Sequence, residues 1–235
     1  MESKYSERTF ESAGGAVTDD APGGYDERLN RLLAAATGVI ARVGYEKASM
    51  RMVSKAAGVS LAGMYHYFDS KEKMLFLIQF RTFNSLLAGV RERLHGVSDP
   101  LEQLSVMVRA HVSYFAANMA ALKVCSHELD SLSGDAYEET RRIRHEYYEL
   151  TRDIVRRVLN GRAPGQTADV HIATMCLFSM LNWLYRWYDP RRGRAPSALA
   201  NQVLQQFVHG LLGTEFAAEQ AEAAESGEDG PDGEH

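Results

Sequence analysis

The sequence contains little cysteine and proline and no long apolar run. Its 235 residues include two cysteines, Cys125 and Cys176, and six prolines. The two thiols lie far apart, each within an apolar pattern, so we expect buried free thiols in a reducing compartment rather than a disulfide framework. No segment reaches the roughly 18 consecutive apolar residues of a membrane span, and the N-terminal stretch lacks the apolar core of a signal peptide. These absences predict a cytoplasmic protein without membrane association.

The sequence also lacks the motifs of common enzyme classes. It contains no nucleophile elbow, no phosphate-binding P-loop and no dinucleotide-binding glycine pattern. The pairs His127–Glu128 and His145–Glu146 are adjacent in sequence, and adjacent side chains on a helix point about 100° apart, so neither pair forms a metal-ligand face. We therefore expect a protein that is not an enzyme and that binds no metal or cofactor.

Charge is distributed unevenly along the chain. The formal net charge is -5, but residues 25–81 contain nine lysines and arginines against five acidic residues, whereas the residues after Gly213 contain eight acidic residues and no lysine or arginine. Screening at physiological salt limits the reach of an exposed charge to roughly 8 Å, so the local balance decides the affinity for phosphate. The segment 25–81 can therefore bind nucleic acid although the whole chain is acidic.

Apolar residues recur at helical spacing through most of the chain, and almost no segment alternates as a strand does. The pattern predicts an all-α fold, which glycine, proline and capping residues divide into about nine helices. We expect the first to end at residue 44 and the others to cover about 49–57, 60–68, 70–94, 100–115, 120–132, 134–160, 168–188 and 197–212.

Composition divides the chain into four parts. Residues 1–24 are polar and glycine-rich, and residues 214–235 are rich in alanine, glycine and acidic residues, so we expect a disordered arm and a disordered acidic tail. Between them we expect a small basic domain over 25–73 and a larger helical domain over 74–213.

Two short helices and a tight turn are predicted between Gly44 and Leu75. A helix of about nine residues is not stable alone in water, so each needs partners. Gly58 can adopt the positive φ that a turn between crossed helices requires, and Val59 fills the corner. The apolar positions that we expect to share a small core are Leu33, Ala36, Ile40, Met52, Val53, Ala56, Leu61 and Met64. The pattern predicts a helix-turn-helix.

The outer face of the second short helix carries small and polar residues that can approach the major groove of DNA. Tyr65 and His66 can donate to a phosphate or a base edge, and Lys71 combines its charge with the positive end of the next helix. Alternatively, Tyr65, Tyr67 and Phe68 are the aromatic core of a small bundle; we accept that interpretation for Phe68 and in part for Tyr67. The predicted DNA-binding residues are Ser49, Arg51, Ser60, Leu61, Ala62, Gly63, Tyr65, His66, Tyr67 and Lys71.

A specific set of runs lies between Gly44 and Glu72, within a stretch of about fifty residues where the resemblance is strong: Gly44-Tyr45, Ser49-Met50-Arg51, Ala56-Ala57-Gly58-Val59-Ser60, Met64-Tyr65-His66-Tyr67-Phe68 and Ser70-Lys71-Glu72. In these runs the chain resembles the TetR family of repressors. The resemblance implies a homodimer whose recognition helices enter successive major grooves of a palindromic double-stranded operator. It also implies an effector-binding domain, here 74–213, whose last two helices form the subunit interface.

The helix expected over 168–188 is apolar around most of its circumference. Such a helix can pack on its own domain on one side and on a second copy on the other, although a simple core helix is the alternative. Its stretch from Asn182 to Tyr188 resembles one in TetR-type regulators that answer to acyl-CoA thioesters of fatty acid and steroid breakdown. The resemblance implies a large effector that carries phosphates.

Ligand contacts are predicted from residues of mixed aromatic and polar chemistry, each of which also suits an ordinary core or surface position. The predicted ligand-binding residues are Phe83, His111, Tyr114, Phe115, His127, Tyr148, Phe178, Asn182, Trp183 and Arg186. Cationic contacts could come from Arg141, Arg142, Arg144, Arg152, Arg156, Arg157 and Arg186. For the arginines of the seventh helix we favour a solvated face paired with Glu138, Glu139, Glu146 and Glu149.

The favoured hypothesis is a ligand-responsive transcriptional repressor of the TetR type. Binding of a small-molecule effector, of the acyl-CoA class, would move the long helix that follows the helix-turn-helix and spread the recognition helices out of groove register. The alternatives are an architectural or activator DNA-binding protein without an effector and a helical enzyme.

Overall fold

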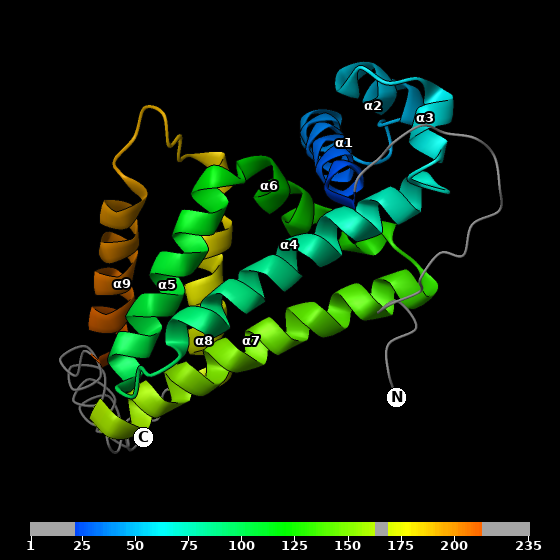
Figure 1. Ribbon diagram of the computed structural model, residues 1–235. Helices are drawn as coiled ribbons and strands as arrows, with labels where there is room; N and C mark the ends of the chain where they lie inside the picture. The colour runs from blue at the N-terminus through cyan, green and yellow to red at the C-terminus, as the bar shows by residue number, and fades with distance from the viewer. Residues whose placement is uncertain (1–21, 163–168, 213–235) are drawn as a thin grey trace, which may run out of the picture.

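The computed structural model describes residues 22–162 and 169–212, which form nine α-helices and two short 3-10 helices without a strand (Figure 1). The elements are α1 (Pro22–Val43), α2 (Met50–Ala57), α3 (Leu61–Tyr65), α4 (Lys71–Leu94), α5 (Pro100–Ala117), α6 (Met119–His127), η1 (Leu129–Ser131), α7 (Gly134–Arg162), α8 (Val170–Asn182), η2 (Leu184–Arg186) and α9 (Pro196–Leu212). The prediction of an all-α fold is confirmed. Within the described ranges, no helix combines the length and the apolar character needed to cross a membrane. The predicted acidic tail and residues 1–21 of the predicted arm lie outside these ranges.

Serine side chains cap the starts of α2, α3 and α4 as the sequence predicts. The hydroxyl oxygens of Ser49, Ser60 and Ser70 accept from the backbone N–H three residues later, at 3.3, 3.0 and 3.0 Å. Each cap satisfies one of the N–H groups that have no partner within the helix. The first helix begins at Pro22, so the last three residues of the predicted arm are helical.

Three helices end earlier than predicted. The third ends at Tyr65, the sixth at His127 and the eighth at Asn182. After Asn182 the chain continues in the tighter turn of η2, where Leu184 is buried and the Tyr185 hydroxyl hydrogen-bonds to Nε2 of His127 at 2.5 Å. The hydrophobic period along the chain carries no information about such tertiary contacts. The prediction from that period therefore placed the end of the eighth helix too late.

The described residues form two hydrophobic cores. The smaller is built by α1, α2, α3 and the first turns of α4, and Val53, Met64 and Phe68 are completely buried in it. The larger is built by α5, α7, α8, α9 and the later turns of α4, and Leu104 and Val155 are completely buried there. Two separate cores agree with a small N-terminal unit followed by a larger one.

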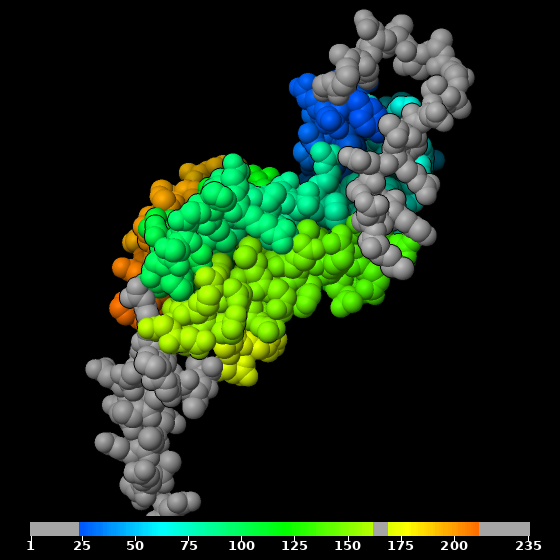
Figure 2. Space-filling model, turned by 60° about the horizontal axis from the view of Figure 1, so that its bottom comes forward, coloured from blue at the N-terminus to red at the C-terminus, as the bar shows by residue number. Residues whose placement is uncertain are grey.

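Helix α4 belongs to both units. Met74 and Leu75 near its start are buried in the smaller core, whereas Leu87 and Val90 near its end are buried in the larger one. Figures 1 and 2 show α4 leaving the N-terminal helices and running along α7 for most of its length. The domain boundary expected after residue 73 therefore lies inside a helix that serves both units.

Two predictions of burial are wrong. Ala56 is exposed on α2, and Cys176 is exposed on α8, on the same face as Ile172 one turn earlier. Cys125 is buried as predicted, and burial raises the pKa of its thiol to about 12, so the thiol stays protonated at neutral pH. An apolar helical pattern does not distinguish a side that faces the subunit core from a side that faces outward.

A buried histidine lies in the larger core. The ring of His111 is 1% exposed, and its Nδ1 lies 3.0 Å from the hydroxyl oxygen of Tyr147. Its Nε2 has no hydrogen-bond partner among the described residues, and the ring of Phe115 lies 4.8 Å away between centroids. Burial lowers the pKa of His111 to about 3, so this ring is neutral in the folded protein at neutral pH.

Because the pKa of His111 is lowered, we expect the free energy of unfolding to fall as the solution becomes acidic. Below a pH of about 6.5 the unfolded chain binds a proton at this position that the folded chain excludes until near pH 3, so the free energy of unfolding falls with pH across that window. By about pH 5 the loss is about 2 kcal/mol. Urea unfolding at about pH 7.5 and pH 5 should show it in the native protein, and H111F should lack this part of the pH dependence. Identical pH dependence in both proteins would contradict the assignment.

Candidate DNA-binding surface and effector cavity

The turn between α2 and α3 depends on a glycine. Gly58 has a φ of +69°, in the left-handed region that glycine adopts without steric cost. The N–H of Val59 then donates to the carbonyl oxygen of Ser54 at 3.0 Å, which closes the end of α2. Beyond the turn, Met64 anchors α3 in the smaller core. The predicted helix-turn-helix is therefore confirmed.

The outward face of α3 carries small and polar residues. Ser60, Ala62 and His66 are exposed, and Tyr65 is 50% exposed although it is a large aromatic residue. Arg51 is exposed near the start of α2. Small residues allow a close approach to bases, and hydroxyl and guanidinium groups at the edges can donate to phosphates.

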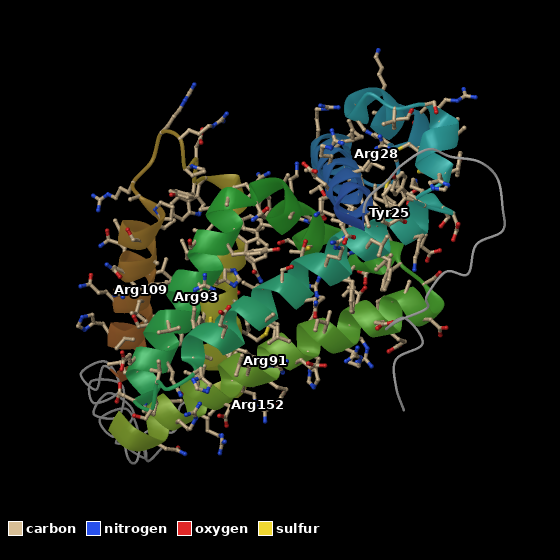
Figure 3. The ribbon with its side chains drawn as sticks, in the orientation of Figure 1. Tyr25, Arg28, Arg91, Arg93, Arg109 and Arg152 are labelled. Carbon is tan, nitrogen blue, oxygen red and sulfur yellow. The ribbon has the colours of Figure 1, made fainter. Side chains whose placement is uncertain are left out.

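Arginines at the opposite end of the molecule lie far from this face. Figure 3 shows Tyr25 and Arg28 beside the helix-turn-helix, whereas Arg91 and Arg152 lie toward the other end. There Arg91 pairs with Glu146 at 3.4 Å. These distant arginines are engaged within the subunit and are not part of the candidate DNA-binding surface.

A cavity of about 910 Å³ lies between α6, α7, α8, η2 and α9. Four of the predicted ligand-binding residues, His127, Phe178, Asn182 and Trp183, line it together with Arg144. Its size and its mixture of aromatic and polar side chains are typical of small-molecule sites. Among the residues that the structure describes, no cluster of three or more histidine, cysteine or acidic side chains could hold a metal ion.

Two family models match the two units separately. The model described as "Bacterial regulatory proteins, tetR family" matches residues 32–78, and "Tetracyclin repressor-like, C-terminal domain" matches residues 97–211. The crystal structure of the TetR family regulator PfmR from Thermus thermophilus is 30% identical with a TM-score of 0.68, over 75% of this chain and 96% of that chain. The chain belongs to the TetR family.

Two further proteins match almost over their whole length. The HTH-type transcriptional repressor KstR2 of Rhodococcus jostii is 25% identical over 194 residues, which are 82% of this chain and 95% of KstR2. The structure of AibR in complex with isovaleryl coenzyme A and operator DNA has a TM-score of 0.68 at 21% identity, over 76% of this chain and 97% of that chain. This chain is a TetR-type transcriptional regulator.

Some predicted DNA-binding residues of this TetR-family chain also have partners within the protein. The ring of Tyr67 stacks on Tyr25 of α1 with centroids 5.0 Å apart. The ammonium of Lys71 donates to the carbonyl oxygen of Tyr45 at 3.1 Å and lies 4.0 Å from the centre of that ring. Both side chains therefore hold the recognition unit together, and their contact with DNA stays a prediction, as it does for the rest of that set.

The structure does not bring six of the ten predicted ligand-binding residues to the cavity. They are Phe83, His111, Tyr114, Phe115, Tyr148 and Arg186. The rings of Phe83, His111 and Phe178 surround Tyr147 in the neighbouring core, so Phe178 separates this group from the cavity. Tyr148 pairs instead with His171 at 2.6 Å. Four of the predicted residues therefore line the cavity and six lie elsewhere, and the role of all ten in ligand binding stays a prediction.

The arginines of α7 separate into two groups. Most pair with acidic residues three or four positions away, as the solvated-face interpretation predicts: Arg141 with Glu138, Arg142 with Glu139 and Glu146, Arg152 with Glu149, and Arg156 and Arg157 with Asp153. Arg144 does not fit the favoured solvated-face interpretation: it was named only as one of seven possible cationic contacts, and it is partly buried and lines the cavity. The helical register could have distinguished Arg144 from the other arginines, because position 144 lies on the same face of the helix as Thr140 and Thr151, which are buried.

Replacement of the turn glycine should destabilise the protein in a way that a helical glycine does not. An added Cβ would meet no atom within 4 Å at Gly58 or at Gly38 of α1, but only Gly58 has a positive φ. G58A should therefore lower the free energy of unfolding by about 1 to 2 kcal/mol. G38A should raise it by up to about 1 kcal/mol, because alanine is the better helix former. Urea unfolding of both variants checks this, and equal shifts would show that φ is not the cause.

Proposed function

We propose that this TetR-family protein is a cytoplasmic transcriptional repressor that binds a palindromic operator as a homodimer and leaves it when an acyl-CoA thioester occupies the cavity. The observation that carries the proposal is the continuity of α4, which packs both against the helix-turn-helix and in the domain that contains the cavity. A ligand that changes the packing of α4 can thereby change the position of α3. AibR, of similar fold, is described with isovaleryl coenzyme A and operator DNA together, which supports this pair of ligands.

The surface of α8 and η2 supports the homodimer. Four of the six large hydrophobic side chains that are exposed among the described residues lie there: Ile172, Met175, Trp183 and Trp187, with exposures of 61, 45, 55 and 61%. Exposed apolar side chains gathered on one segment are typical of an interaction surface, and a second copy would cover them through the same surface. Met175, Trp183 and Trp187 also line the cavity, so the second copy would lie at the edge of the cavity. A two-fold dimer also supplies the two recognition helices that a palindrome requires.

A charge on this face should therefore dissociate the dimer. I172R would bury a guanidinium in the interface without an acidic partner, which is costly. Sedimentation equilibrium should therefore show a monomer. The control is A88R, on the exposed side of α4, which should remain dimeric. A dimeric I172R, or an A88R variant that dissociates equally, would place the interface elsewhere.

The face of α3 should carry the affinity for DNA. The probe is a duplex that the native protein selects from a random pool, because selection supplies a binding sequence while the operator is unidentified. R51A and Y65A should each weaken binding by about tenfold, and R51A should also lower the slope of log affinity against log salt by about one. R141A is the control, since Arg141 is exposed on α7 and pairs with Glu138. If R51A and Y65A remain dimeric and bind the duplex with unchanged affinity, the assignment of this surface to DNA binding would be wrong.

Release by a thioester separates this function from an architectural DNA-binding protein. Isovaleryl-CoA and stearoyl-CoA are titrated into the complex with the selected duplex, with free CoA as control. Because Trp183 and Trp187 line the cavity, release of the duplex and a change of tryptophan fluorescence should occur over the same concentration range. An architectural protein without an effector would show neither change.

A further inference from the structure

Arg144 differs from the neighbouring arginines of α7 in its partners. No described carboxylate lies within ion-pair distance of its guanidinium, whereas Arg141 and Arg142 on the same helix both form ion pairs. Asp130 acts on it only through longer-range charge, and burial is the largest influence, which lowers the pKa of the Arg144 guanidinium. A largely desolvated charge without a carboxylate in contact is costly, so the position of Arg144 at the cavity points to a ligand that completes its contacts.

The guanidinium of Arg144 is positioned by neutral groups. Its Nη1 donates to the carbonyl oxygen of Cys125 at 2.7 Å and approaches Oε1 of Gln79 at 3.4 Å, and the group lies 4.9 Å from the ring centre of Phe83. Both hydrogen bonds to described residues leave from Nη1, while the side chain lines the cavity. A guanidinium has five N–H donors, so donors remain for a ligand in the cavity.

The same hydrogen bonds lead from the cavity to the helix-turn-helix. Gln79 of α4 is completely buried, and its Nε2 donates to the carbonyl oxygen of Glu128 at 2.8 Å. The carboxylate of Glu128 accepts from the backbone N–H of Tyr45 at 3.0 Å and from the Ser131 hydroxyl at 3.1 Å. Tyr45 lies between α1 and α2, so a sensor-domain carboxylate holds the loop that precedes the helix-turn-helix.

We propose that Arg144 is the anchor for an anionic oxygen group of the effector, a phosphate or a carboxylate, and that this contact draws it away from Gln79 and Cys125 and thereby loosens the hold of Glu128 on Tyr45. The inference rests on the proposed function, because it names the group of the effector that the cavity recognises. An anionic oxygen is a stronger acceptor for a guanidinium than a neutral carbonyl or amide oxygen, so it competes for the same fork. The Arg144–Gln79–Glu128–Tyr45 set is called the relay below.

The first test measures release of the selected duplex from the full-length dimer. Stearoyl-CoA, stearate and free CoA are titrated separately, which distinguishes a phosphate from a carboxylate as the anionic group. R144Q should raise the concentration of the active compound at half release by about tenfold or more, the value of one charge-assisted hydrogen bond. R141Q should stay within about twofold of the native protein. Equal release by R144Q and the native protein would overturn the anchor.

The second test follows the backbone amide of Tyr45 by hydrogen exchange and needs no effector. R144Q and E128A should each speed its exchange without ligand, the double variant should exchange no faster than E128A alone, and R141Q should exchange as the native protein does. Unchanged exchange in R144Q would overturn the relay, whether or not any compound releases the native protein from DNA. Failure of every compound to release the native protein would contradict only the proposed acyl effector. If R144Q does not fold, R144K keeps the charge without the fork and should show the same direction of change.

Discussion

The burial of α4 in two hydrophobic cores is the constraint on which the rest of the structure depends. An α-helix rises about 1.5 Å per residue with every interior backbone group bonded within it, so it behaves as a stiff rod rather than a linker. Met74 and Leu75 hold one end of this rod under the recognition unit, and Leu87 and Val90 hold the other end in the sensor domain. Because packed interiors do not deform continuously, a change of its tilt displaces both units.

A second connection joins the two units through α6 and the chain that follows it. Val124 of α6 is buried in the smaller core together with residues of α1, although α6 belongs to the sensor part of the chain. In the chain that follows α6, Ser133 donates from both its backbone N–H and its hydroxyl to the carboxylate of Glu72 at the start of α4, at 2.8 and 2.7 Å. Hydrogen bonds depend steeply on distance and angle, so a small displacement of this segment relative to α4 weakens these contacts.

Local features of the sequence predicted local features of the structure well. The serine caps, the positive φ of Gly58 and the order of the helices follow from neighbours in the chain, and the structure has them. Helix ends set by distant partners were wrong, as at Asn182, where the Tyr185–His127 hydrogen bond accompanies a tighter turn. The exposure of Cys176 was also not predicted. An apolar period shows which helix positions are apolar, but it does not show whether they pack within the subunit or lie on its surface.

The sequence by itself determined the helical class, the helix-turn-helix and the resemblance to TetR regulators, since periodicity, capping and turn geometry act over a few neighbouring residues. Only the tertiary structure decided which of several similar arginines faces the cavity and which polar groups connect it to the recognition unit. Tyr45, Gln79, Glu128 and Arg144 are widely separated along the chain, and helix packing alone brings them within hydrogen-bond distance. Their chemistry can be read from the sequence, but their partners depend on the angles at which the helices cross.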